Sequence, residues 1–108
     1  MWSALTPTPA AAHAIVVASD PAVDAVLHGT KFPVMLRFNS RIDQERSRLT
    51  LLRADATSEP LPLAPSASPD TLSATLEGMP PGHYRLRWQV LAVDGHITRG
   101  DIPFTVAP

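Results

Sequence analysis

Apolar and polar residues alternate along most of this chain from residue 14 onward, with the period of two that is typical of β-strands. The clearest run covers residues 84–90, where Tyr, Leu, Trp and Val alternate with Arg, Arg and Gln, and it predicts a central strand. No helical period of useful length and no internal repeat is present. The pattern predicts seven short strands, at residues 14–17, 23–28, 32–38, 49–53, 72–76, 84–90 and 102–106. This number and spacing favour an all-β sandwich.

The segments between these strands carry charged or turn-forming residues. Residues 41–48 are mostly charged and are expected to form a loop, and residues 54–70, rich in Pro, Ser and Ala, a loop or an irregular edge hairpin. Pro33 lacks a backbone donor, so its strand must lie at a sheet edge or place Pro33 in its first turn. The segment 79–84 (Met-Pro-Pro-Gly-His-Tyr) suits a tyrosine corner, with an ordinary core Tyr84 as the alternative. Both interpretations give the same fold.

Length and composition narrow the chemistry that such a domain could perform. The 108 residues suffice for one domain, and the absence of Cys excludes a disulfide, a Cys-type zinc site and a thiol nucleophile. A net charge of -1 argues against a nucleic-acid partner. No apolar run approaches the roughly 20 residues of a membrane span, so membrane insertion is not expected. Any metal chemistry must therefore use oxygen and imidazole ligands.

The first twelve residues differ from the rest of the chain. They carry no charge and end in three alanines, Ala10-Ala11-Ala12, directly before His13. Small residues at these positions are typical of a signal-peptidase site, although a basic start and an apolar centre are lacking. Residues 1–12 are thus interpreted as a signal-peptide remnant shortened by start-codon choice, with a disordered extension as the alternative. The functional domain is expected to cover residues 13–108 and to begin at His13.

Asp94 and His96 form one candidate ligand pair, directly after the strongest predicted strand. In an extended chain residues i and i+2 point to the same face, so a carboxylate and an imidazole would lie side by side, with Gly95 allowing tight backbone geometry. The Asp-x-His triplet is also common by chance. The alternative is therefore a solvated surface pair without a metal.

His13 is the second candidate, because an N-terminal His offers both its α-amine and ring Nδ1 to one metal ion. With Asp94 and His96 this gives three nitrogens and one oxygen, a set that suits the tetragonal geometry of Cu(II) better than the tetrahedral geometry of zinc. Cu(I) would need thiolate or thioether clusters, whereas Met35 and Met79 are scattered and are expected to pack in the fold. The remaining histidines, His28 and His83, have weaker cases.

The chain resembles the CopC family of bacterial periplasmic copper-binding proteins over about residues 13–106. The resemblance rests on His13-Ala14 after the cleavage-like site, on Pro-Gly-x-Tyr-x-x-x-Trp at 81–88 and on Asp-Gly-His-x-x-x-Gly at 94–100. It implies a seven-stranded Greek-key β-sandwich similar to cupredoxins and immunoglobulin domains. It also implies Cu(II) bound by His13, Asp94 and His96. The Met-rich loop that some members carry for Cu(I) is absent here, which favours a Cu(II)-only type.

The resemblance further implies copper homeostasis or resistance in the periplasm, by sequestration or by delivery to a CopD-type inner-membrane importer, without catalysis. A monomer is expected. Two alternatives from other classes remain open. One is a histidine-brace copper enzyme that oxidises polysaccharides, which would need a broad aromatic face, although five of the six aromatics are at inward strand positions. The other is a metal-free immunoglobulin-like binding module.

Overall fold

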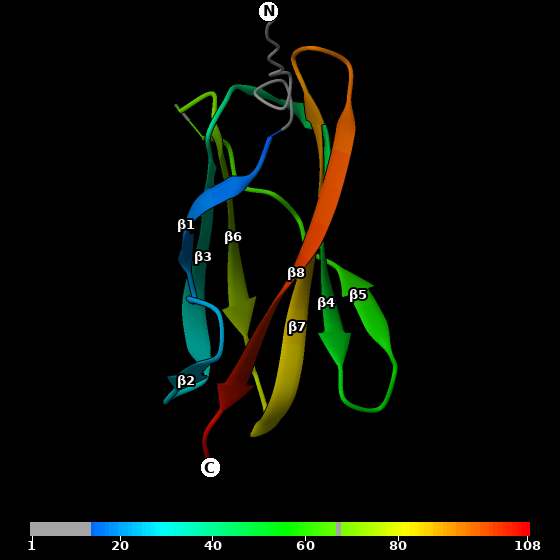
Figure 1. The fold of residues 1–108 in the computed structure, drawn as a ribbon. Coiled ribbons are helices and arrows are strands. Elements are labelled where there is room, and N and C mark those ends of the chain that lie inside the picture. The colour runs from blue at the N-terminus through cyan, green and yellow to red at the C-terminus, as the bar shows by residue number, and fades with distance from the viewer. Residues whose placement is uncertain (1–13, 67) are drawn as a thin grey trace, which may run out of the picture.

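The architecture is all-β, with two sheets packed face to face in a computed structural model of the chain (Figure 1). The structure describes residues 14–66 and 68–108. Within these ranges no helix has the length and apolar character needed to cross a membrane. The expected β-sandwich is thus confirmed.

One sheet has three strands in the order β1-β3-β6, and the other has five in the order β2-β8-β7-β4-β5. The strands of both sheets, in chain order, are β1 (Val16–Asp20), β2 (Ala25–Leu27), β3 (Lys31–Phe38), β4 (Ile42–Arg53), β5 (Ser58–Pro60), β6 (Thr71–Glu77), β7 (Gly82–Ala92) and β8 (Ile97–Val106). All described pairs are antiparallel except β2 with β8. The strand predicted as central, β7, lies in the middle of the larger sheet.

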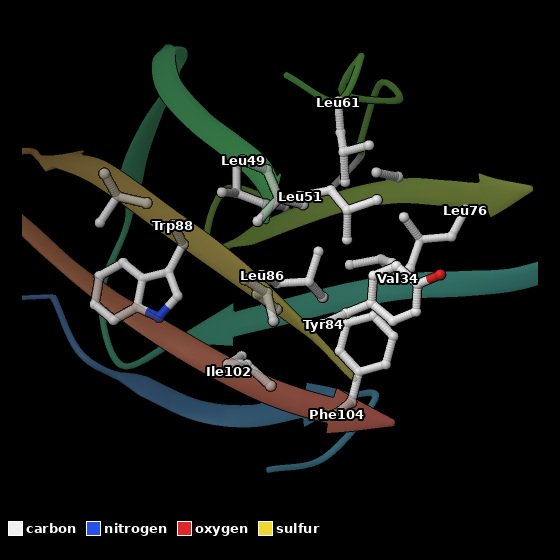
Figure 2. Packing of buried hydrophobic residues seen from close by; sticks show 14 of the residues in the cluster. Val34, Leu49, Leu51, Leu61, Leu76, Tyr84, Leu86, Trp88, Ile102 and Phe104 are labelled. Carbon is white, nitrogen blue, oxygen red and sulfur yellow. The ribbon is translucent and has the colours of Figure 1, made fainter. Parts of the chain in front are cut away.

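The alternation seen in the sequence corresponds to burial in the structure. Side chains of β3 and β7 are buried at every second position, and Leu36, Leu86 and Val90 are fully buried. Figure 2 shows the inward side chains of both sheets meeting in one core, with Tyr84 stacked on Phe104 at a centroid distance of 5.4 Å. The five aromatics of the strands, Phe32, Phe38, Tyr84, Trp88 and Phe104, all lie in this core. The outward positions of β7 from residue 83 to residue 89 carry polar residues, and Leu91 follows them near the end of the strand.

Pro33 is the third residue of β3 and lies outside the stretch that pairs with β1, so it occupies a sheet edge, as one of the two predicted arrangements requires. Although β3 is the middle strand of its sheet, its pairing with β1 involves only Met35 to Phe38. Pro33 is paired with Thr75 of β6 on the other side. The missing donor therefore does not interrupt the ladder to β1.

The prediction of a loop over residues 41–48 is wrong, because the strand predicted at 49–53 already begins at Ile42 as β4. The eighth strand of the described residues is β5, which pairs with β4 at the edge of the larger sheet, within the segment 54–70 expected to form a loop or an irregular edge hairpin. The register of β4 against β7 shifts between Asp43 and Arg48, so this stretch is irregular. There the Ser47 hydroxyl donates to the Asp43 carbonyl oxygen at 2.6 Å and accepts the Leu91 amide at 3.4 Å. A side chain thus supplies contacts that regular pairing would supply, and the usual alternation is lost.

A tyrosine corner is present at the connection from β6 to β7, where the chain passes from one sheet to the other. The Tyr84 phenol donates a hydrogen bond to the backbone carbonyl of Pro80, four residues upstream. Met79, just before it, is buried, at 4% exposure. The tyrosine corner that this segment suits is thus present, and it fixes the connection between the two sheets.

Gly100 leaves room for the Trp88 indole, which lies opposite it in the pairing of β7 with β8. A Cβ added at Gly100 would lie 2.6 Å from Trp88 Cζ2 and 2.9 Å from Cε2, closer than such contacts occur. We expect Gly100→Ala to lower the free energy of unfolding by about 1–3 kcal/mol, measured by urea unfolding. The smaller ring of Trp88→Phe should recover part of this loss, and a cost that persists in full in the double variant contradicts the explanation.

Asp101 on the outer face of β8 accepts hydrogen bonds from Arg87 Nε at 2.8 Å and Arg85 Nη1 at 3.2 Å. These two contacts hold the pKa of Asp101 below its usual range, and the hydrogen bond from Arg87 has the larger effect. Since the unfolded chain then binds more protons, stability from this group is present above about pH 4 and is lost as the pH falls through the folded-state pKa.

We therefore expect wild type to exceed Asp101→Asn in unfolding free energy at pH 7 by no more than about 1 kcal/mol, because both arginines are half exposed. Urea unfolding should show this difference shrinking below about pH 4. A difference that grows with acidity would contradict the assignment.

Candidate metal centre

The loop between β7 and β8 carries the Asp-x-His triplet at one end of the sandwich. The loop is closed by two backbone hydrogen bonds, from the Ala92 amide to the His96 carbonyl oxygen and from the Gly95 amide to the Ala92 carbonyl oxygen, both 2.9 Å. Gly95 has a φ of 90°, a left-handed conformation that side chains disfavour. The glycine between the two candidate ligands is thus required by the turn.

Asp94 and His96 lie side by side, but the extended chain assumed from the sequence is not the reason. One Asp94 oxygen, Oδ1, accepts the His96 backbone amide at 3.0 Å, and the other, Oδ2, contacts His96 Nδ1 at 2.9 Å. The first bond is an Asx turn, in which a side chain closes its own loop. The His96 side chain is 60% exposed and that of Asp94 26%, so the pair is accessible from solvent.

The start of the described chain lies against the same hairpin. Thr98, two residues after His96, donates its hydroxyl to the Ala14 carbonyl oxygen at 2.8 Å. Ala14 is fully buried. The next amide, that of Ile15, donates to Asn39 Oδ1 at 2.9 Å. Position 14 is therefore fixed beside β8, close to the loop that bears Asp94 and His96.

His13, the third predicted ligand, lies outside the described residues. Among residues 14–66 and 68–108, no group of three or more His, Asp or Glu side chains could hold a metal ion. The structure thus brings together two of the three predicted ligands and places the attachment point of the third nearby. Sequence reasoning missed Thr98 and Asn39, since neither stands in a motif that points to Ala14 or Ile15.

The other candidates are separated from this loop. His28 is exposed in the turn between β2 and β3. His83 lies at the opposite end of β7, where its Nδ1 contacts Thr105 Oγ1 at 3.1 Å. Met79 is buried in the core, as expected, whereas Met35 is 43% exposed, so the prediction that it packs in the fold is wrong. Met35 points outward because it occupies an outward position of β3.

The donor set at the hairpin fits a borderline divalent ion. It offers imidazole nitrogen and carboxylate oxygen, a combination that suits Cu(II) and zinc more than Cu(I). Because Asp94 contacts Nδ1 of His96, a metal bound at Nε2 would keep Asp94 as the carboxylate that orients the ring. A metal bound at Nδ1 would take the place of that contact, and an Asp94 oxygen would then be a second ligand of the same metal.

Comparisons with known proteins point to one family. A family model described as the CopC domain matches residues 16–107. The crystal structure of CopC from Methylosinus trichosporium OB3b superposes with a TM-score of 0.79 at 25% identity, over 89% of this chain and 95% of that one. PcoC, described as a methionine-rich copper resistance protein from Escherichia coli, gives a TM-score of 0.73 at 26% identity, over 88% and 99%. A comparison with curated proteins gives no match.

A third similar structure shows the fold alone. Fibronectin(III)-like modules of CbhA from Clostridium thermocellum superpose with a TM-score of 0.52 at 15% identity, over 87% of this chain and 45% of that one. The sandwich architecture is therefore shared with proteins of other kinds, and the fold by itself does not identify the chemistry.

Proposed function

This chain belongs to the CopC family, and from that premise we propose that it binds Cu(II) through His13, Asp94 and His96 in the periplasm of a bacterium. Its role would be copper homeostasis and resistance. One similar structure, PcoC, is described as a copper resistance protein. The proposal thus joins the family assignment to the donor set of this particular chain.

The observation that carries the proposal is the position of Ala14 beside the hairpin of Asp94 and His96. Ala14 is bonded to Thr98, and Thr98 follows His96 by two residues in the same chain. Consecutive Cα atoms are only about 3.8 Å apart, so a residue at position 13 is attached within reach of that loop. Removal of residues 1–12 would give His13 a free α-amine as well as its ring.

The proposal of Cu(II) in place of Cu(I) is supported by the kinds of side chain that the chain offers. Cu(I) sites favour thiolate or thioether clusters. This chain has no Cys and three Met. Of these, Met79 is buried and Met35 is exposed on the outer face of the other sheet, so these two cannot join one site with His96. The neighbour PcoC, by contrast, is described as methionine rich.

The described surface fits a protein that captures and delivers copper better than an enzyme that oxidises polysaccharides. All five aromatic side chains of the strands are buried in the core, so the described residues offer no aromatic face for a polysaccharide. We therefore favour a carrier, active as a monomer, that sequesters copper or hands it to a CopD-type inner-membrane importer. A copper-dependent oxidation of polysaccharide by the loaded protein would contradict this part of the proposal.

The proposed function is tested by titrating Cu(II) into protein that begins at His13. Every strand of the described residues lies within 16–106, so this form retains both sheets of the sandwich. We expect one Cu(II) ion per chain with a tetragonal EPR spectrum, and no comparable retention of Cu(I). An EPR spectrum that remains that of free Cu(II) would contradict the assignment and favour a metal-free binding module.

A further inference from the structure

Two residues outside the predicted ligand set hold the backbone at the start of the domain. Both polar groups of the Ala14–Ile15 peptide are bonded to side chains: its carbonyl oxygen to Thr98 Oγ1 at 2.8 Å, and its amide to Asn39 Oδ1 at 2.9 Å. The backbone amide of Asn39 in turn donates to the Ile15 carbonyl oxygen at 2.9 Å. These residues lie 84 and 24 positions away along the chain, so the contacts depend on the complete fold.

The two side chains come from different sheets. Thr98 belongs to β8 of the larger sheet and follows His96 by two residues along the chain. Asn39 directly follows β3 of the smaller sheet. Figure 1 shows the first described residues passing toward β1 at the end of the sandwich where β7 turns into β8. The peptide therefore bridges the two sheets at the end that carries Asp94 and His96.

Backbone pairing contributes only one bond here, from the Asn39 backbone amide to the Ile15 carbonyl oxygen. The ladder between β1 and β3 begins only at Val16, which is paired with Phe38. Ala14 and Ile15 precede it, so their position depends on Thr98 and Asn39. Ala14 is fully buried, and its carbonyl oxygen would lose a hydrogen-bond partner if the Thr98 hydroxyl were removed.

We propose that Thr98 and Asn39 are positioning residues that act as a latch on the Ala14–Ile15 peptide, so that ligand donors at position 13 meet Asp94 and His96 already in place. The inference rests on the proposed function. A chelating arm that is ordered only part of the time binds its metal more weakly, in proportion to the fraction of time it is in place. The latch raises that fraction before copper arrives.

The latch itself is tested without metal, by amide hydrogen exchange in the full chain. Thr98→Val keeps the shape of the side chain and removes the donor, and should speed exchange of the Ile15 amide about tenfold. Thr98→Ser keeps the hydroxyl and should exchange like wild type. Asn39→Leu should behave like Thr98→Val, and Asn39→Asp, which keeps the acceptor oxygen, like wild type.

Two controls separate opening of the latch from general loosening. Thr105→Val makes the same substitution in the same strand, at the end where Thr105 contacts His83, and should leave Ile15 unchanged. The amide of Val90, opposite Thr98 in β7, should stay slow in every variant. An unchanged Ile15 amide in Thr98→Val overturns the latch, whatever the metal does.

The consequence for copper is tested on protein that begins at His13. Thr98→Val should bind Cu(II) about tenfold more weakly with the same EPR spectrum, because the ligands are unchanged, and Thr98→Ser should restore the affinity. Faster Ile15 exchange with undiminished affinity overturns the positioning role. A wild-type protein that binds no Cu(II) contradicts the proposed function instead, and the exchange data then show separately whether the latch exists.

Discussion

Replacing His96 by alanine is expected to lower the Cu(II) affinity of the protein that begins at His13 by more than about 100-fold, because changes that only orient a ligand already cost about 10- to 100-fold. His96 is exposed at the tip of the β7–β8 hairpin, so its removal leaves the core intact. Asp94→Asn should cost at least about tenfold, since Asp94 contacts His96 Nδ1 at 2.9 Å. Competition titrations with a chelator of known affinity measure both losses.

His28→Ala is the matched control for this prediction. His28 is also an exposed histidine in a turn, but its turn connects β2 with β3. Its removal should leave the Cu(II) affinity within about twofold of wild type, which is less than 0.5 kcal/mol. Equal losses in the His28 and His96 variants would show that copper binds to surface histidines without selection, and would remove the basis for the site.

Retaining residues 1–12 should lower the Cu(II) affinity as much as the loss of a ligand side chain does. In the unprocessed chain the nitrogen of His13 belongs to a peptide bond, where its lone pair is delocalised into the carbonyl group, so this nitrogen binds a metal only if the metal displaces the amide proton. A free α-amine has an ordinary pKa of roughly 7.7–8.0, so Cu(II) can displace its proton near neutral pH. We therefore expect the unprocessed protein to bind Cu(II) more than about 100-fold more weakly than the form that begins at His13.

The same titration with both forms of the protein checks this expectation. Acetylation of the amine of the processed form is the sharper control, because it blocks one nitrogen and adds no chain. Its affinity should fall to that of the unprocessed protein. If all three forms bind equally, the α-amine is not a ligand, and the role assigned to the His13 amine is wrong. Intact mass of the secreted protein would show which form the cell produces.

The fold was predictable from the sequence where one side of a strand is buried. Residues 32–38 and 84–90 alternate strictly, and both became strands with every second side chain in the core. The start of β4 was not predictable in this way. Its register shifts between Asp43 and Arg48, and Ser47 replaces regular pairing with side-chain bonds, so its polar residues no longer alternate with apolar ones.

The candidate site was predictable only in part, for a similar reason. The nearness of Asp94 to His96 follows from two positions in one loop, although the loop is a turn closed by the Asp94 carboxylate and not an extended strand. The contact of Thr98 with Ala14 joins residues 84 positions apart, and no local pattern reports it. Hydroxyl and amide side chains that bond distant backbone groups become visible only when the sheets are placed together.

The most direct test of the proposed Cu(II) site is pulsed EPR that counts the nitrogen donors of Cu(II) bound to protein beginning at His13. Coordination by His13, Asp94 and His96 predicts coupling to two imidazole rings and one amine nitrogen. The His96→Ala variant should lose one of the two imidazole couplings and keep the other. An identical pattern of couplings in wild type and His96→Ala would contradict the site.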